Sequence, residues 1–330
     1  MAGLPRHRTD LKQVFAQAAE TMTAPCKTDP ARDATRLSAT IFCGTGPVSI
    51  ALVRAWLDAG NTLSAVVVGH PQATLRSRWR TLVAEGVRVI GTRYPVDWTS
   101  IEQTLEQEQP DVLLCYAFMR KIPDTLLRRF RHGGLNFHPS LLPHYHGPNP
   151  MRCLVADRAI REHGGVTLHC MTSQYDAGDV VAQRRMTPAE FVDYDTYRAA
   201  LSEHIADLVT NAVPDFCAGR ITPIAQTGEG IEARHLPAAV TIDASDWLAD
   251  EIEAACALLY RQTRLELRME PRQTPFPIRA VLQREPPGHG APPRIGAAFA
   301  RCDCADARIT LLRDNLIGQL VHSLMRRLRH

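Results

Sequence analysis

This sequence of 330 residues lacks the features that mark several classes of protein. No repeat or low-complexity block covers a substantial part of it, and its hydrophobic fraction of 45% is ordinary for a globular chain. No apolar stretch approaches the roughly 18 residues of a membrane span, and the N-terminus has no apolar secretory core. These absences exclude a disordered chain, a fibrous repeat and a small disulfide scaffold, and we expect no membrane anchor.

Charge and cysteine content say little about partners. A net charge of +3 over this length neither demands nor excludes nucleic acid. The nine cysteines are an odd number with scattered spacing, and Cys43 and Cys115 lie inside apolar runs. We therefore expect reduced core thiols in a cytoplasmic protein. Cys302 and Cys304 form a C-x-C pair, but no Cys or His pair follows at zinc spacing, so no metal site is expected.

From Leu37 onward, short apolar runs alternate with helical stretches. The predicted strands are residues 39–43, 63–68, 87–90, 111–115, 134–138 and 165–171, and the predicted helices are residues 48–59, 75–85, 100–108 and 191–212. Short links between alternating strands and helices imply right-handed crossovers and a mostly parallel sheet. Ligand sites in such sheets lie at the carboxyl ends of the strands. The pattern therefore predicts a Rossmann-like α/β domain.

The alternation of predicted strands and helices ends near residue 225. A helical segment over residues 247–259 is followed by four short strand-like runs and a Pro/Gly-rich stretch. These elements predict a small, mainly β domain built as an OB-like barrel. We expect a loosely ordered N-terminal extension over residues 1–36, the α/β domain over 37–225 and the C-terminal domain over 226–330.

A glycine turn, Gly44-Thr45-Gly46, lies between the first predicted strand and helix. It is neither a dinucleotide fingerprint nor a Walker loop, because no third glycine or Lys-Ser/Thr pair follows. Two interpretations stay open: a tight strand-to-helix turn, or a contact to phosphate or substrate through free N–H groups.

The segment around Asn136 and His138 carries more information. In a strand these two side chains share one face, and Pro139 then ends the ladder, so they lie where the strand opens into a loop. An isolated histidine there is often structural. Beside an amide, however, an imidazole can transfer a proton while the amide donates to a developing oxyanion.

A turn with two acidic residues follows the last predicted strand. Gly178 permits a tight turn between Asp176 and Asp179. The turn is either purely structural, or it brings Asp176 to His138, where the carboxylate would fix the tautomer and raise the basicity of the imidazole.

Together these motifs resemble the folate-dependent formyltransferase family, which includes methionyl-tRNA formyltransferase, glycinamide ribonucleotide transformylase and the sugar-nucleotide N-formyltransferases. The similarity spans roughly residues 38 to 185 and consists of Asn136, His138, Ser140 to Pro143, Gly147, Pro150, Gly165 to Thr167 and Asp176 to Asp179. It implies a domain that binds 10-formyltetrahydrofolate and transfers its formyl group to an amine through a tetrahedral intermediate, without a metal.

The resemblance also implies roles for individual residues. Asn136 would hold the oxyanion, His138 would stabilise it as a cation or assist proton transfer, and Asp176 would support His138. The residues expected at the folate are Tyr116, Phe118, Met119, Ile122, Leu142, Thr172, Gln174, Gly178 and Asp179. Those expected at the substrate are Gly44, Thr45, Gly46, Ser140, Gly147 and Asn149.

Three shorter stretches of the sequence indicate which amine accepts the formyl group. The basic insert of the tRNA-directed branch has no counterpart at residues 69–76, whereas residues 146–150 and 165–169 resemble the sugar-nucleotide branch. We therefore expect a small primary amine, either an aminosugar nucleotide or an amino-acid-derived metabolite precursor, with tRNA less favoured. The alternatives are a methionyl-tRNA formyltransferase, a 10-formyltetrahydrofolate hydrolase and a non-catalytic folate-binding relative. The C-terminal domain either recognises substrate or forms a homodimer.

Overall fold

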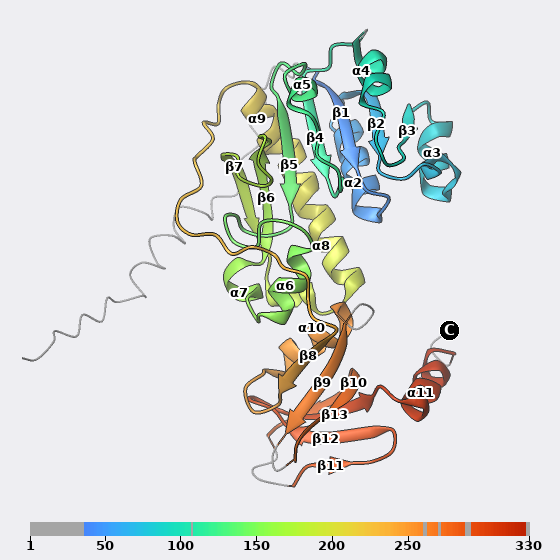
Figure 1. The fold of residues 1–330 in the computed structure, drawn as a ribbon, viewed down its shortest axis with the longest axis vertical. Helices are drawn as coiled ribbons and strands as arrows, with labels where there is room; N and C mark the ends of the chain where they lie inside the picture. Colours follow the sequence, from blue (N-terminus) through green and yellow to red (C-terminus); the bar gives the residue numbers. More distant parts are fainter. Residues whose placement is uncertain (1–35, 107, 260–262, 270–271, 288–291, 328–330) are drawn as a thin grey trace, which may run out of the picture. The chain divides into compact units, whose positions relative to one another are not determined.

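The structure is a computed structural model that describes residues 36–106, 108–259, 263–269, 272–287 and 292–327 (Figure 1). Almost all of the predicted N-terminal extension, residues 1–36, lies outside the described residues.

A seven-stranded sheet forms the centre of the first half of the described chain. Its strands are β1 (Ser38–Cys43), β2 (Thr62–Val68), β3 (Val89–Gly91), β4 (Val112–Tyr116), β5 (Gly134–His138), β6 (Gly165–Cys170) and β7 (Val180–Arg185). They are arranged in the order β3-β2-β1-β4-β5-β6-β7. The pairs from β3 to β5 are parallel, whereas β6 runs antiparallel to β5 and β7 antiparallel to β6. The predicted mostly parallel, Rossmann-like sheet is confirmed.

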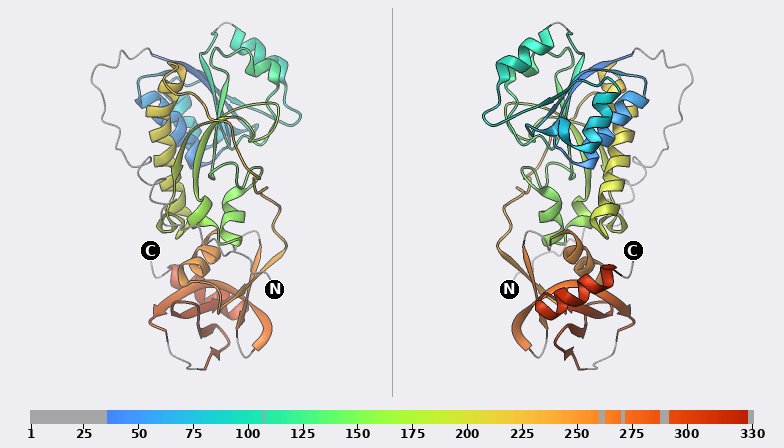
Figure 2. Two further views of the ribbon diagram at one scale, coloured as in Figure 1. Left: turned by 90° about the vertical axis from the view of Figure 1, so that its left-hand side faces the viewer. Right: turned by 90° about the vertical axis from the view of Figure 1, so that its right-hand side faces the viewer.

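Helices cover both faces of this sheet (Figure 2). The face with α2 (Pro47–Asp58), α3 (Ser77–Ala84) and α8 (Tyr194–Asp207) shares one apolar cluster, and the face with α4 (Trp98–Glu106) and α5 (Asp124–Leu127) shares another. Strand alternation explains the division, because neighbouring residues Ile41 and Phe42 of β1 belong to opposite clusters. Both faces are buried, which is why these strands are continuous apolar runs.

Shorter helical elements lie between these strands and helices, and they are harder to predict from the sequence. They are η1 (Ala73–Leu75), α6 (Pro150–Ala156), α7 (Ile160–His163), η2 (Pro188–Phe191), the π-helical turn η3 (Leu208–Ala212) and α9 (Val213–Cys217). The helix predicted over 191–212 begins instead at Tyr194, where Asp193 caps the first turn through its hydrogen bond from the Thr196 N–H. The strand predicted over 87–90 is shifted to Val89–Gly91.

The last part of the chain forms a six-stranded, mainly antiparallel sheet. Its strands are β8 (Ala239–Asp243), β9 (Arg264–Met269), β10 (Arg272–Glu285), β11 (Arg294–Ile295), β12 (Phe299–Asp303) and β13 (Arg308–Arg313), accompanied by α10 (Ala249–Leu258) and α11 (Leu316–Arg327). The order is β11-β12-β13-β10-β9-β8, and only the β8–β9 pair is parallel. The expected mainly β second region is confirmed, whereas its OB-like barrel form and the boundary near residue 225 stay predictions.

The cysteines of the described residues are all free thiols. Six of these eight are buried, among them Cys43 and Cys115, as expected for core thiols. Burial raises the pKa of the thiols, to about 12 for Cys115 and Cys302. Within the described part of the chain, no three His, Cys, Asp or Glu side chains are grouped as metal ligands would be. In the same residues no helix is both long and apolar enough to cross a membrane.

Candidate active site

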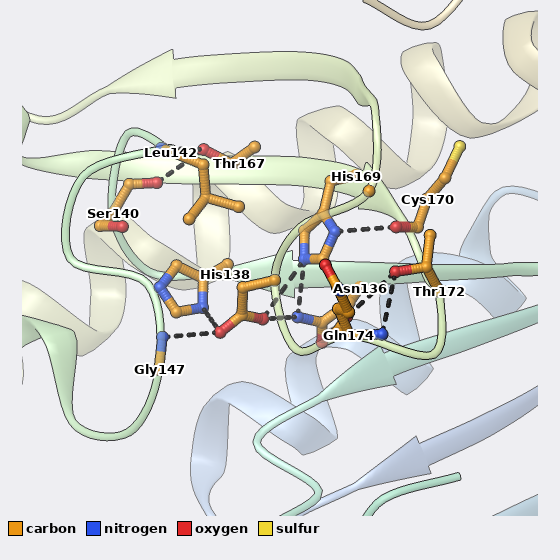
Figure 3. Close-up of polar contacts among 12 residues, drawn as sticks. Asn136, His138, Ser140, Leu142, Gly147, Thr167, His169, Cys170, Thr172 and Gln174 are labelled. Carbon is orange, nitrogen blue, oxygen red and sulfur yellow. Dashed lines mark hydrogen bonds and ion pairs between the residues drawn. The ribbon is translucent and has the colours of Figure 1, made fainter. Parts of the chain in front are cut away.

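The carboxyl end of β5 presents two polar side chains in a largely apolar sheet. Asn136 and His138 are two residues apart on this strand and lie on the same side of it (Figure 3). Phe137, between them, points into the opposite apolar core and is 1% exposed. Strand geometry thus places the amide and the imidazole side by side, as the sequence predicts.

Asp176 is the residue on which the polar contacts of the site converge. Its Oδ2 accepts a hydrogen bond from the Gly147 N–H at 2.8 Å and lies 3.4 Å from Nδ1 of His138. Its Oδ1 lies 3.4 Å from Nδ2 of Asn136 and 3.6 Å from Nε2 of His169. The predicted trio of Asn136, His138 and Asp176 is therefore assembled, and His169 is a fourth member.

The pKa of Asp176 follows from these contacts. Burial alone would raise the pKa, but the neighbouring His169 and His138 side chains and the Gly147 N–H lower it to about 2. The carboxylate is therefore ionised at neutral pH and is a weak base.

The turn that carries Asp176 is fixed by the backbone. Asp176 has a φ of 52°, in the left-handed region, and its carbonyl accepts a hydrogen bond from Nε2 of Gln226 at 2.7 Å. The same amide donates to the carbonyl of Gly178 at 2.8 Å. A Cβ on Gly178 would lie 1.9 Å from the carbonyl oxygen of Cys170, so only glycine fits there. The predicted glycine requirement thus arises from a close backbone approach.

The neighbours of His138 determine its tautomer. Nε2 lies 2.8 Å from the carbonyl oxygen of Tyr145, which can only accept, so Nε2 carries a proton and donates it. In the neutral ring, Nδ1 then faces Asp176 without a proton; in the cation, an Nδ1–H donates to Asp176. Burial lowers the pKa of His138, and the charge of Asp176 opposes this by raising it. The site can therefore take up one proton between the imidazole and the carboxylate.

Asn136 is oriented by His169, which is not among the predicted site residues. Nδ1 of His169 lies 3.0 Å from the Cys170 carbonyl and donates to it, which leaves Nε2 to accept from Nδ2 of Asn136 at 3.0 Å. Thr167 and His169 share one face of β6, and their spacing of two residues within a predicted strand already indicates this in the sequence. The pairing of His169 with Asn136 depends on the antiparallel direction of β6, which strand and helix alternation does not reveal.

These groups open onto a cavity of about 590 Å³. Of the residues predicted at the folate, the cavity is lined by Tyr116, Phe118, Met119, Ile122, Thr172 and Gln174, and of those predicted at the substrate by Gly147 and Asn149. Asn136, His138 and Asp176 also line it. A volume of this size suits a small organic ligand, and most of its wall is apolar with a few convergent polar groups.

Seven predicted residues do not line this cavity, namely Leu142, Gly178, Asp179, Gly44, Thr45, Gly46 and Ser140. Ser140 is fully buried, and its hydroxyl donates to the His144 carbonyl at 2.7 Å. The N–H of Leu142 donates to Thr167 Oγ1, and that of Gly44 donates to the Tyr116 carbonyl. A ligand-binding role for any of these seven residues stays a prediction.

The sequence matches the family model described as "Formyl transferase" over residues 96–214. The match extends from the start of α4 to the start of α9 and includes Asn136, His138 and Asp176. Residues 96–214 are thus similar to the formyl transferase family. The resemblance seen in the sequence is thereby confirmed for the segment that contains the site.

Relatives of this formyl transferase segment include methionyl-tRNA formyltransferases. That of Listeria innocua is 35% identical over 133 residues, which cover 40% of this chain and 42% of the relative. That of a Geobacillus strain is 28% identical over 197 residues, which cover 57% of this chain and 61% of the relative. The chain thus spans less than two thirds of the length of these curated relatives.

Solved structures share the fold over a longer part of the chain. The N-formyltransferase from Helicobacter canadensis, solved with folinic acid and dTDP-3-aminofucose, has a TM-score of 0.57 and 14% identity over 83% of this chain and 98% of that one. HypX from Aquifex aeolicus has a TM-score of 0.51 and 17% identity over 84% of this chain and 44% of that one. At these low identities the likeness shows a common fold.

Proposed function

We propose that the protein is a 10-formyltetrahydrofolate-dependent N-formyltransferase that acts on a primary amine of a small molecule. The observation that carries the proposal is the convergence of Asn136, His138 and Asp176 on the wall of a 590 Å³ cavity, within a segment of the formyl transferase family. The folate suits this cavity, because Phe118, Met119 and Ile122 offer apolar surface to a flat ring beside the polar trio. When bound, it would supply the formyl group.

The side chains then have separable tasks. Asn136 Nδ2 would exchange its long 3.4 Å contact with Asp176 for a hydrogen bond to the formyl oxygen, where negative charge develops as the amine attacks. His138 would share a proton with Asp176 through Nδ1, so that a proton released by the amine is taken up beside the reacting atoms. Asp176, ionised and anchored by the Gly147 N–H, would hold the resulting imidazolium in place.

The proposal is tested with purified protein, 10-formyltetrahydrofolate and a panel of aminosugar nucleotides and amino-acid-derived amines. Replacing Asn136 or His138 by alanine should reduce formyl transfer by about 100-fold or more, the usual contribution of such groups. Circular dichroism and folate binding should stay unchanged. His70→Ala is the matched control, since His70 is half-buried and does not line the cavity. Full activity of His138→Ala would remove His138 from the mechanism.

A methionyl-tRNA formyltransferase is the second candidate, favoured by the relatives that are 28–35% identical. The small-molecule acceptor is supported by the missing basic insert and by the fold shared with a sugar-directed enzyme. Methionyl-tRNA and the amine panel, offered in competition, separate the two candidates. Release of formate without any amine would indicate a hydrolase, and folate binding without turnover would indicate a non-catalytic relative.

A further inference from the structure

Glu232 is a carboxylate on the wall of the cavity that the proposed mechanism does not use. It lies in the extended segment 224–234, which connects the two sheets. The side chain is exposed, and within the described residues it makes no ion pair or hydrogen bond with another side chain. A cavity-lining carboxylate without a partner is free to attract a cationic group of a ligand.

The backbone holds Glu232 close to the catalytic carboxylate. The N–H of His146 donates to the Ile231 carbonyl at 3.1 Å, and the N–H of Ala233 donates to the His146 carbonyl at 2.7 Å, so Glu232 is paired with His146 in a short parallel bridge. A Cβ built on Gly147 would be 4.0 Å from Cγ of Glu232. The N–H of Gly147 is also the group that holds Asp176. Glu232 therefore lies next to Gly147, the residue whose N–H binds Asp176.

Asp176 cannot attract the amine in its place. Both of its oxygens already have partners, so neither is free to receive an ammonium group. A primary amine in water at neutral pH is mostly an ammonium ion, so it needs an anionic group at the entrance to the reacting centre. Of the carboxylates that line the cavity, Glu232 is the one without a partner among the described residues.

A cation that also lines the cavity completes the argument. Arg152 of α6 lines the cavity, and its buried Nε has no hydrogen-bond partner. Among the described residues it forms no ion pair, whereas its neighbours Arg158 and Arg234 are bound to Glu251 and Asp157. Arg120, also at the cavity, lies over the Tyr94 ring and donates to the Met119 carbonyl. An unpaired guanidinium beside a cavity is suited to a carboxylate or phosphate.

We propose that Glu232 and Arg152 bind the acceptor as a zwitterion, with its ammonium group at Glu232 and its anionic group at Arg152. The acceptor class is thus a primary amine that also carries a carboxylate or a phosphate. This inference rests on the proposed function, because it names the acceptor of the same site. Glu232 and Arg152 are binding residues, and the chemistry stays with Asn136, His138 and Asp176.

Steady-state kinetics with four kinds of acceptor test this inference: aminoalkyl carboxylates, aminoalkyl phosphates, an aminosugar nucleotide and simple alkylamines without an anion. Glu232→Gln should raise KM for charged acceptors by about tenfold, which corresponds to about 1.4 kcal/mol, with kcat and the KM of the folate unchanged. Arg152→Gln should raise KM only for acceptors that carry an anion. Glu229→Gln, on the same segment but outside the cavity lining, and Arg80→Gln, on α3, are the matched controls.

An unchanged KM in both variants would overturn the inference, as would an equal rise in the KM of the folate, which indicates a general distortion of the site. The wild-type preference between carboxylates and phosphates identifies the anion. If no acceptor is formylated, the proposed function fails, and calorimetry of the same amines decides the inference separately. Binding of the zwitterions that Glu232→Gln weakens would support it, and no binding would overturn it.

Discussion

In the site without ligands, the polar atoms of the trio contact one another and the backbone. Asn136 directs its amide hydrogens to His169 and Asp176, and His138 directs its two nitrogens to Tyr145 and Asp176. Such a network fixes the side chains in one arrangement, because each contact restrains the next. The arrangement of these side chains is therefore largely set before a ligand enters.

The ionisation of His138 is the first prediction at this scale. Because burial lowers its pKa and Asp176 raises it, we expect a pKa below 6.5 in the native protein and a still lower one in Asp176→Asn. NMR titration of the labelled imidazole measures both values. A pKa of His138 that rises in Asp176→Asn would contradict the assigned contact.

The second prediction concerns stability against acid. The pKa of Asp176 falls from 3.8 to about 2 on folding, so its ionised form stabilises the fold above pH 4, and this contribution is lost as the pH falls toward 2. The shift corresponds to about 2 kcal/mol. Urea unfolding of the wild type and Asp176→Asn at several pH values should show a difference in free energy that shrinks between pH 4 and pH 2. A free-energy difference that does not change with pH would show that the ionisation of Asp176 does not stabilise the fold.

At the scale of elements, the extended segment 224–234 holds the two loops that build the site. Gln226 binds the turn of Asp176, and residues 231–233 pair with the loop of His146 and Gly147. Arg234 then forms an ion pair with Asp157 at the end of α6. One stretch of irregular chain thus sets the spacing between the two loops.

Gln226 offers the third prediction. Gln226→Ala removes two hydrogen bonds to the carbonyls of Asp176 and Gly178 and should cost about 1 to 2 kcal/mol of stability. We also expect a lower kcat with an unchanged KM for the folate, together with a shifted pKa of His138 by NMR. Gln72→Ala, at an exposed position, is the control. A loss of stability without any change at His138 would show that Gln226 serves the fold alone.

Local sequence signals account for the sheet and for half of the site. The apolar runs of β1, β2 and β4 and the alternation around Asn136 and His138 predict these elements because each depends on its own residues. The direction of β6, the partner of Asn136 and the approach of Glu232 depend on residues tens of positions away. Segment 224–234 has no periodic pattern, so no local signal reveals it.

At the scale of the whole molecule, residues from both sheets belong to one apolar cluster. Leu208 beside the first sheet and Ile242 and Leu267 of the second are among its members. Arg158 also pairs with Glu251 of α10 and lies over the Trp247 ring, 5.6 Å from its centroid. Shared burial of this kind couples the stability of the two sheets.

The fourth prediction is that the two sheets unfold together. A variant with Trp56, Trp79 and Trp98 replaced by phenylalanine keeps Trp247 as its single tryptophan, in the C-terminal part of the chain. Its fluorescence should change at the same urea concentration as far-UV circular dichroism. In the reciprocal variant, Trp247→Phe, the fluorescence of the remaining tryptophans and far-UV circular dichroism should likewise share one midpoint. Two separate midpoints would show that the sheets are independent.

The buried thiols make the chain its own reporter of structural opening. Alkylating reagents attack the thiolate, and at Cys43, Cys256 and Cys302 burial both raises the pKa and limits access. Labelling at Cys43 of β1 therefore requires the first sheet to open, while labelling at Cys302 of β12 requires the second sheet to open. Mass spectrometry of the modified peptides can thus show which sheet opens first, without any engineered label.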